Sequence, residues 1–214
     1  MFRRKQNNRL SGFTLIELAI VLGIAGVLAG GLWRLMSTGT QQSKDVATAQ
    51  QQQIIINAVK GFLADTTATG GQAMLNSMGA AAKIPLMSSG MSCTTPPTPY
   101  FATFCTYLPS GFTPMMTNPY GQSYTVQLLS GGTTPTLNYS FMILTSGGTT
   151  IPDTDGGRIS ALIGSDGGFI YNSSVCGASS ATLACGTMGA WSVNNVKTTY
   201  GFATSSIGAI ASLS

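Results

Sequence analysis

The first third of the chain carries two hydrophobic patterns in succession. Residues 13–33 form an apolar run with one charged side chain, Glu17, and the run ends at Arg34. At about 1.5 Å per residue, a helix of this length spans about 31 Å, close to the hydrocarbon thickness of a bilayer. From Arg34 to about Asp65, apolar residues recur at three- and four-residue spacing, which predicts an amphipathic continuation of the same helix.

One stripe of this second helical segment, called the apolar stripe below, is predicted to carry Ala47, Gln51, Ile54, Ile55, Ala58 and Phe62. The other faces are predicted to carry the polar and charged positions, such as Lys44, Asp45, Gln52 and Lys60. The pair Gly70–Gly71 ends the segment. Together the two patterns predict a helix of about 50 residues, about 75 Å long.

Beyond residue 70 the patterns become shorter. A short helix is predicted over residues 71–83, ended by Pro85, and a Pro-, Thr- and Ser-rich loop over residues 87–119. Strands are predicted at 123–129, 137–144 and 169–171, with a fourth from the segments 176–185 and 191–193; a short helix is predicted at 157–163, capped by Asp155. A long helix packed on an antiparallel sheet is an α+β fold.

Composition excludes several function classes. The chain has 7% charged and 43% hydrophobic residues and no histidine, which removes the usual general base and the commonest metal ligand. No P-loop and no Gly-x-Ser-x-Gly motif occurs. We therefore expect no enzyme, no cofactor and no metal. A calcium site built from Asp153, Asp155 and Asp166 is the alternative, but turn and helix-capping roles explain these aspartates more simply.

The distribution of charge indicates orientation rather than nucleic-acid binding. Four of the ten Lys and Arg residues lie in the first nine positions, namely Arg3, Arg4, Lys5 and Arg9. From Phe13 onward, six basic and six acidic residues balance, so no basic stripe marks a nucleic-acid partner. A basic leader before an apolar run stays in the cytoplasm, which predicts that everything after Arg34 lies outside.

All four cysteines lie in the second half of the chain: Cys93, Cys105, Cys176 and Cys185. An even count in an exported domain without histidine predicts two disulfides rather than a zinc site. The spacing also lacks the tight Cys-x2-Cys element of zinc ribbons. Of the three possible connectivities we favour the sequence-local pairs, Cys93–Cys105 and Cys176–Cys185.

The junction Ser11–Gly12 precedes the apolar run, the reverse of the order in a secretory signal peptide. The sequence Gly12-Phe13-Thr14-Leu15-Ile16-Glu17 resembles the processing motif of type IV prepilins and of the pseudopilins of type II secretion. The resemblance implies that a prepilin peptidase cuts after Gly12 and methylates Phe13. It also implies the type IV pilin fold, with a removed leader (1–12), a transmembrane and filament-core helix (13–33), an amphipathic extension (34–66) and a disulfide-containing head (67–214).

Glu17 is the charged residue of the apolar run. A carboxylate inside an apolar helix is costly, so it usually has a partner or a function. We expect Glu17 of one subunit to meet the amino group of Phe13 on another and so to set the axial register of a filament. The alternative is a glutamate that reaches the water at the membrane face.

A second resemblance involves the C-terminal half. The segments 118–121, 158–164, 167–170, 185–186 and 191–193 are similar to the pilin portion of type IVb conjugative-pilus tip adhesins of the shufflon type. The two resemblances imply a minor subunit of a type IVb-like pilus whose head contacts cells in adhesion or conjugation. The alternative is a type II secretion pseudopilin that acts in a periplasmic piston.

The same resemblances imply partners and location. The expected partners are other pilin subunits, the prepilin peptidase and an inner-membrane assembly platform. The precursor is expected to cross the bacterial inner membrane once, with a periplasmic C-terminus, before it enters a pilus at the cell surface.

Overall fold

The computed structural model describes residues 14–77, 83–113, 116–133, 136–177 and 179–214. The predicted processing residues Gly12 and Phe13 lie outside these ranges. The chain divides into two compact units, Met1–Gln42 and Ser43–Ser214, and the second is called the head below. Helix α1 (Leu15–Ala64) contributes residues to both units, and its 50 residues agree with the predicted length.

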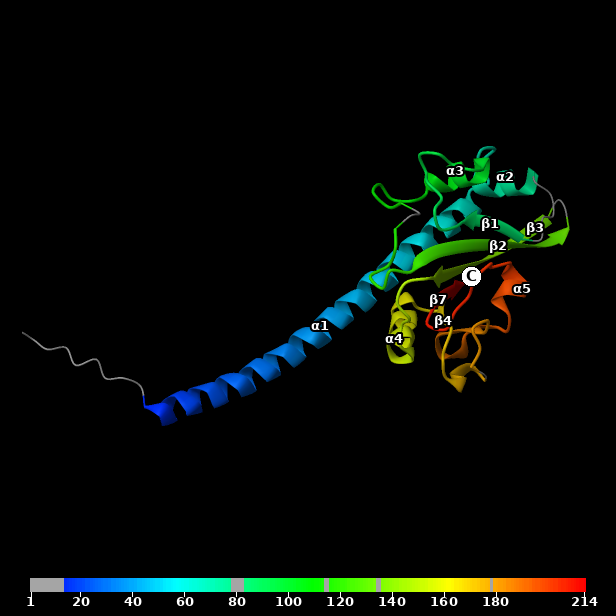
Figure 1. The fold of residues 1–214 in the computed structure, drawn as a ribbon. Helices are drawn as coiled ribbons and strands as arrows, with labels where there is room; N and C mark the ends of the chain where they lie inside the picture. The colour runs from blue at the N-terminus through cyan, green and yellow to red at the C-terminus, as the bar shows by residue number, and fades with distance from the viewer. Residues whose placement is uncertain (1–13, 78–82, 114–115, 134–135, 178) are drawn as a thin grey trace, which may run out of the picture. The chain divides into compact units, whose positions relative to one another are not determined.

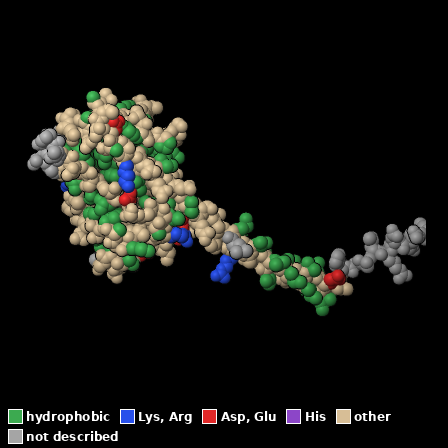
Figure 2. All heavy atoms as spheres, turned by 180° about the vertical axis from the view of Figure 1, so that it is seen from behind, with side chains coloured by type: hydrophobic (Ala, Val, Ile, Leu, Met, Phe, Trp, Pro, Cys, Tyr) green, Lys and Arg blue, Asp and Glu red, His purple; other side chains and the backbone are tan. Residues whose placement is uncertain are grey.

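The first unit is an apolar helix without a covering layer of its own. All side chains described between residues 14 and 40 are exposed, and Figure 2 shows hydrophobic side chains gathered along this part of the chain. The most apolar 18-residue window of α1 has a mean hydropathy of 2.3, and none of it is buried. By length and composition, this segment can cross a membrane.

The head combines helices with one antiparallel sheet (Figure 1). Its elements after α1 are α2 (Gly71–Ser77), β1 (Lys83–Met87), α3 (Pro99–Cys105), β2 (Ser123–Thr133), β3 (Thr136–Ser146), α4 (Asp153–Ile163), β4 (Gly167–Phe169), β5 (Ala184–Gly186), β6 (Ser192–Val193), α5 (Val196–Tyr200) and β7 (Ile210–Leu213), with 3₁₀ turns at Ser174–Cys176 and Thr187–Gly189. Among the described residues, seven strands pair in the order β1-β2-β3-β7-β4-β5-β6. The predicted α+β class is confirmed.

The C-terminal strand β7 lies inside the sheet rather than at its edge. It pairs with β3 through Met142, Ile143 and Leu144, and with β4 through Gly167, Gly168 and Phe169. The strand thereby joins the β1–β3 part of the sheet to the β4–β6 part. Our sequence analysis predicted no strand here.

Both faces of the sheet are buried, because alternate residues of β3 belong to two different core clusters. Phe141 and Ile143 belong to the larger core cluster, which also holds Ile55, Val59 and Phe62 of α1. Met142 and Leu144 belong to a second cluster with residues of α5 and β7. Successive side chains of a strand point to opposite faces, so one strand supports both cores.

Several predicted boundaries are wrong for local reasons. Residues 83–87 form the edge strand β1 rather than a helix end, and an edge strand tolerates Pro85 because one side of it needs no ladder hydrogen bonds. The predicted loop contains α3, which Thr98 caps by accepting a hydrogen bond from the Phe101 N–H at 3.4 Å. Asp155 is not the cap of α4, because the N-cap position is held by Pro152.

Candidate assembly site

The start of α1 is built as a capped helix. Thr14 precedes the helix, and its Oγ1 accepts a hydrogen bond from the Glu17 backbone N–H at 3.3 Å. The Leu18 N–H donates to the Thr14 carbonyl oxygen at 3.1 Å. The spacing Thr-x-x-Glu is the capping-box pattern, and a carboxylate in the first turn also interacts favourably with the helix dipole. Our sequence analysis missed the helix-capping role of Thr14, although this spacing could have revealed it.

Glu17 is exposed among apolar neighbours. Leu15, Ile16 and Leu18 are 88%, 70% and 55% exposed. Among the described residues, Glu17 forms no salt bridge within its own chain. The pairing of this carboxylate with the Phe13 amino group of another subunit stays a prediction.

The glycines of the first unit have no packing role within the chain. At Gly23, Gly26, Gly30 and Gly31, an added Cβ would meet nothing within 4 Å. Each glycine weakens the helix by about 1 kcal/mol relative to alanine. Since the helix continues through all of them, their small size provides room for the close approach of another helix.

A buried carboxylate joins α1 to the rest of the head. Asp45 is 1% exposed and accepts hydrogen bonds from the Arg158 Nε, at 2.6 Å, the Arg158 Nη2 and the Tyr120 hydroxyl. Arg158 Nη2 also donates to Asp155 Oδ1 at 2.7 Å. Burial raises the pKa of the Tyr120 hydroxyl, as does its hydrogen bond to Asp45. Our sequence analysis placed Asp45 off the apolar stripe of α1, and it is nevertheless buried, because Arg158 neutralises the charge and makes burial tolerable.

Two further polar contacts fix α4 against α1. Gln53 Nε2 donates to the Leu162 carbonyl oxygen at 3.0 Å, near the end of α4. Lys60 Nζ lies 2.5 Å from Asp166 Oδ2, just beyond that helix. These contacts recur along one side of the head part of α1.

Gln52 is a second residue that our sequence analysis placed off the apolar stripe of α1. The residue is fully buried, and its Nε2 donates to Ser212 Oγ of β7 at 3.0 Å. This bond joins α1 to β7, the strand between the two parts of the sheet.

The three aspartates considered for calcium have separate partners. Asp153 accepts hydrogen bonds from the backbone N–H groups of Asn172 and Ser173 at 2.9 and 3.0 Å. Burial alone would raise the pKa of Asp153, but these hydrogen bonds outweigh it and lower the pKa. Asp155 contacts Arg158, and Asp166 contacts Lys60. Within the described ranges, no cluster of three His, Cys, Asp or Glu side chains could hold a metal ion.

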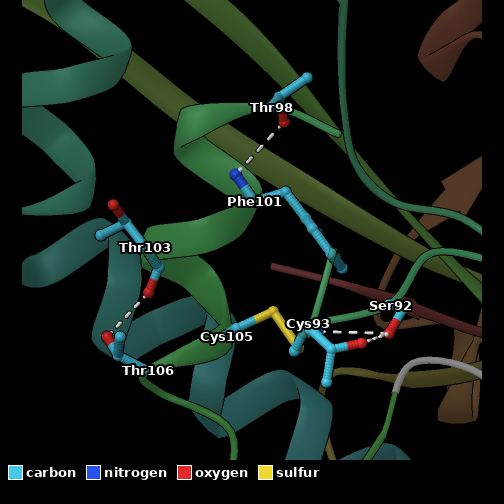
Figure 3. The surroundings of a disulfide bond; sticks show 8 residues. Ser92, Cys93, Thr98, Phe101, Thr103, Cys105 and Thr106 are labelled. Atoms are coloured by element: carbon cyan, nitrogen blue, oxygen red, sulfur yellow. Dashed lines mark hydrogen bonds between the residues drawn. A yellow bond between two sulfur atoms is a disulfide. The ribbon is translucent and has the colours of Figure 1, made fainter. Parts of the chain in front are cut away.

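The structure brings the cysteines together in the two favoured pairs. The Cα atoms of Cys93 and Cys105 are 5.8 Å apart, and those of Cys176 and Cys185 are 6.2 Å apart. Both separations lie in the range of disulfides. Figure 3 shows the first pair, which joins the segment after β1 to the last residue of α3.

Comparison with known proteins supports the N-terminal part of this description. The family model of the prokaryotic N-terminal methylation motif matches residues 7–33. No curated protein and no solved structure matches the chain significantly. The motif implies processing by a prepilin peptidase and assembly with other pilins, which points to a type IV pilin-like or pseudopilin structural subunit rather than an enzyme. The apolar helix is consistent with a precursor anchored in the inner membrane.

Proposed function

We propose that the chain is a minor structural subunit of a type IVb-like pilus, cut after Gly12, methylated at Phe13 and assembled through the N-terminal part of α1. One observation carries the proposal. The methylation-motif match, residues 7–33, includes the start of α1, whose described side chains up to residue 40 are exposed within their own chain.

Such exposure requires a partner outside the chain. The most exposed large apolar residues of this segment include Leu15 at 88%, Val27 at 78% and Trp33 at 79%. Burying a side chain of this kind contributes about 1.5–3 kcal/mol relative to water. The bilayer covers these residues in the precursor, and neighbouring helices cover them in a filament. Because lipid is as apolar as the helix, the filament must be favoured by close packing at the glycines and by polar contacts.

Glu17 supplies the polar contact in this proposal. An unpaired carboxylate in an apolar environment is costly, so pairing with the amino group of a neighbouring Phe13 stabilises the assembled state. The contact forms at one axial stagger of two helices, and it thereby sets the register. The cap contributed by Thr14 holds Glu17 in the first turn whether or not the partner is present.

The head is suited to a position outside the cell. Residues 84–152 contain no charged side chain, and the two cysteine pairs lie at disulfide distance. We infer that both pairs are disulfides in the exported protein, where the environment is oxidising. Peptide mapping without reduction should recover the pairs Cys93–Cys105 and Cys176–Cys185, and recovery of crossed pairs would contradict this inference. A head of this kind would contact recipient cells or surfaces.

The experiment is immunogold labelling of sheared surface filaments with an antibody to residues 84–214. A minor subunit gives label at filament ends, whereas label along the shaft indicates a major pilin. Label confined to the periplasm, with bare filaments, would replace the proposal by the pseudopilin alternative.

Charge variants test the register. Glu17→Gln should abolish filament labelling while the amount of membrane-bound chain stays unchanged. Lys44→Gln, which alters a charge elsewhere on α1, is the matched control and should label as the wild type does.

A further inference from the structure

A pocket of about 530 Å³ lies at the β5–β6 end of the head, away from the assembly helix in sequence. Its lining includes two aromatic residues, Tyr171 and Trp191, the hydroxyl-bearing Ser192, and the apolar Val175 and Met188. None of the lining residues is charged. The proposed pilus function assigns no role to this pocket.

The indole of Trp191 lies against the backbone of two paired glycines. Gly168 of β4 and Gly186 of β5 are directly opposite each other in the sheet. A Cβ at Gly168 would lie 2.4 Å from Cζ2 of the indole, and a Cβ at Gly186 would lie 2.6 Å from its Cδ1 and Nε1. The absence of side chains at both positions therefore lets the indole lie against the sheet, where backbone atoms hold it in place.

The indole also carries an unused donor. Its Nε1 is buried and has no hydrogen-bond acceptor among the residues that the structure describes. A buried donor without an acceptor is unusual, because its desolvation is uncompensated. The indole of Trp191 is therefore a place where a polar partner is missing among the described residues.

The rim of the pocket has two unusually exposed apolar side chains. Met188 is fully exposed, and within the described ranges it is the one non-glycine residue with a positive φ, at 53°. Val175 is 71% exposed. Non-glycine residues in this conformation are uncommon and are found preferentially at functional sites. The rim can therefore contact a molecule that the pocket holds.

We propose that this pocket binds a neutral saccharide, with one sugar ring stacked on the indole of Trp191. A sugar ring has an apolar face of C–H groups and a rim of hydroxyl groups. The aromatic floor suits the face, while the exposed hydroxyl of Ser192 suits the rim. The uncharged lining favours a neutral sugar, because a charged one would lose hydration without gaining an ion pair. The volume lies within the range of small-molecule sites, whereas contact with another subunit would favour a flatter surface.

The binding test uses the full-length chain with Trp33→Phe, so that Trp191 is the remaining one of its two tryptophans. The chain is kept in an amine-oxide detergent, because glycoside detergents would compete for the pocket. An array of neutral and acidic oligosaccharides is probed first, and each retained neutral oligosaccharide is then titrated while the tryptophan emission is followed. The proposal predicts retention of neutral oligosaccharides and a saturable change in emission. Filaments are not needed, so failure of the pilus proposal would leave this result unaffected.

Two variants test whether the saccharide binds at Trp191. Trp191→Ala should weaken binding by about tenfold or more, as expected when a central aromatic contact is removed. Thr125→Ala, in a separate hydroxyl-lined pocket of the head, is the control and should bind as the parent chain does. If Trp191→Ala does not fold, the emission titration of the Trp33→Phe chain decides alone.

Three results would overturn the proposal: no retention of any neutral oligosaccharide, an emission that does not change on titration, or binding that persists unchanged in a folded Trp191→Ala chain. Self-association of the chain that Met188→Ser abolishes, without saccharide binding, would instead identify an interface between copies.

Discussion

Replacing either partner of the buried pair formed by Asp45 and Arg158 should have clearly unequal effects on the stability of the head. The Asp45 side chain is 1% exposed, whereas the Arg158 side chain is 42% exposed. In Arg158→Met, a buried carboxylate loses its countercharge and keeps the Tyr120 hydroxyl as a donor. In Asp45→Asn, the guanidinium can turn toward water, and Tyr120 can still donate to the amide oxygen.

The magnitudes follow from this asymmetry. Removing one partner of a fully buried pair costs about 3–5 kcal/mol, and the exposure of the arginine moves the estimate for Arg158→Met to about 3 kcal/mol. Asp45→Asn loses charge-assisted hydrogen bonds but leaves no buried charge, so we expect about 1–2 kcal/mol. The double variant should be less destabilised than the sum of the single ones by about 1–2 kcal/mol, because the two side chains are in contact.

The assay is guanidinium denaturation of the full-length chain in a zwitterionic detergent, followed by near-ultraviolet circular dichroism. Lys60→Met is the matched control: its pair with Asp166 is 47% and 24% exposed, and its loss should cost at most about 1 kcal/mol. The reasoning is refuted if Asp45→Asn costs more than Arg158→Met, or if the two effects add.

Three further predictions concern a titrating group, the neighbouring glycines of α4 and a glycine of the apolar helix. The lowered pKa of Asp153 gives stability that is complete above pH 3.8 and is lost as the pH falls through the folded value. Asp153→Asn should therefore cost about 1 kcal/mol at pH 7 by thermal denaturation, and this cost should shrink as the pH is lowered below 3.8. Gly156→Ala places a Cβ 2.3 Å from the Phe169 ring and should cost about 1–3 kcal/mol in urea denaturation. Gly157→Ala places its Cβ 3.6 Å from the nearest neighbouring atom and should be neutral or stabilising in the same assay. Equal effects of the two variants would contradict the packing argument. Gly26→Leu should reduce filament yield in electron micrographs while Gly26→Ala should not, and equal yields would exclude close helix contact there.

The anchor and the central hairpin were predictable from sequence because their signals are local. An apolar run with one charged residue specifies α1 up to Trp33, and alternation over several residues specifies β2 and β3. The hairpin register from Ser123 opposite Ser146 to Thr133 opposite Thr136 then needs only neighbouring residues. The structure extends both strands beyond their predicted bounds, since pairing continues where the side-chain pattern has weakened.

Long-range partners account for the main errors. The helical pattern places Asp45 and Gln52 off the apolar stripe, yet both are buried. Their partners are far along the chain: Arg158 is 113 residues beyond Asp45, and Ser212 is 160 residues beyond Gln52. The four-residue strand β7 is likewise defined by the two strands beside it, because its own sequence is too short to show a period. In the candidate site, Glu17 was found from its charge, whereas its cap at Thr14 was overlooked despite a recognisable spacing.

The central claim is that the chain is a prepilin-type precursor whose apolar helix begins the mature protein. Intact mass of the membrane-bound chain, produced together with its cognate prepilin peptidase, tests this claim most directly. The account predicts a mature chain that lacks residues 1–12 and carries one additional methyl group on Phe13. A chain that still begins at Met1 in the presence of an active peptidase would contradict the account.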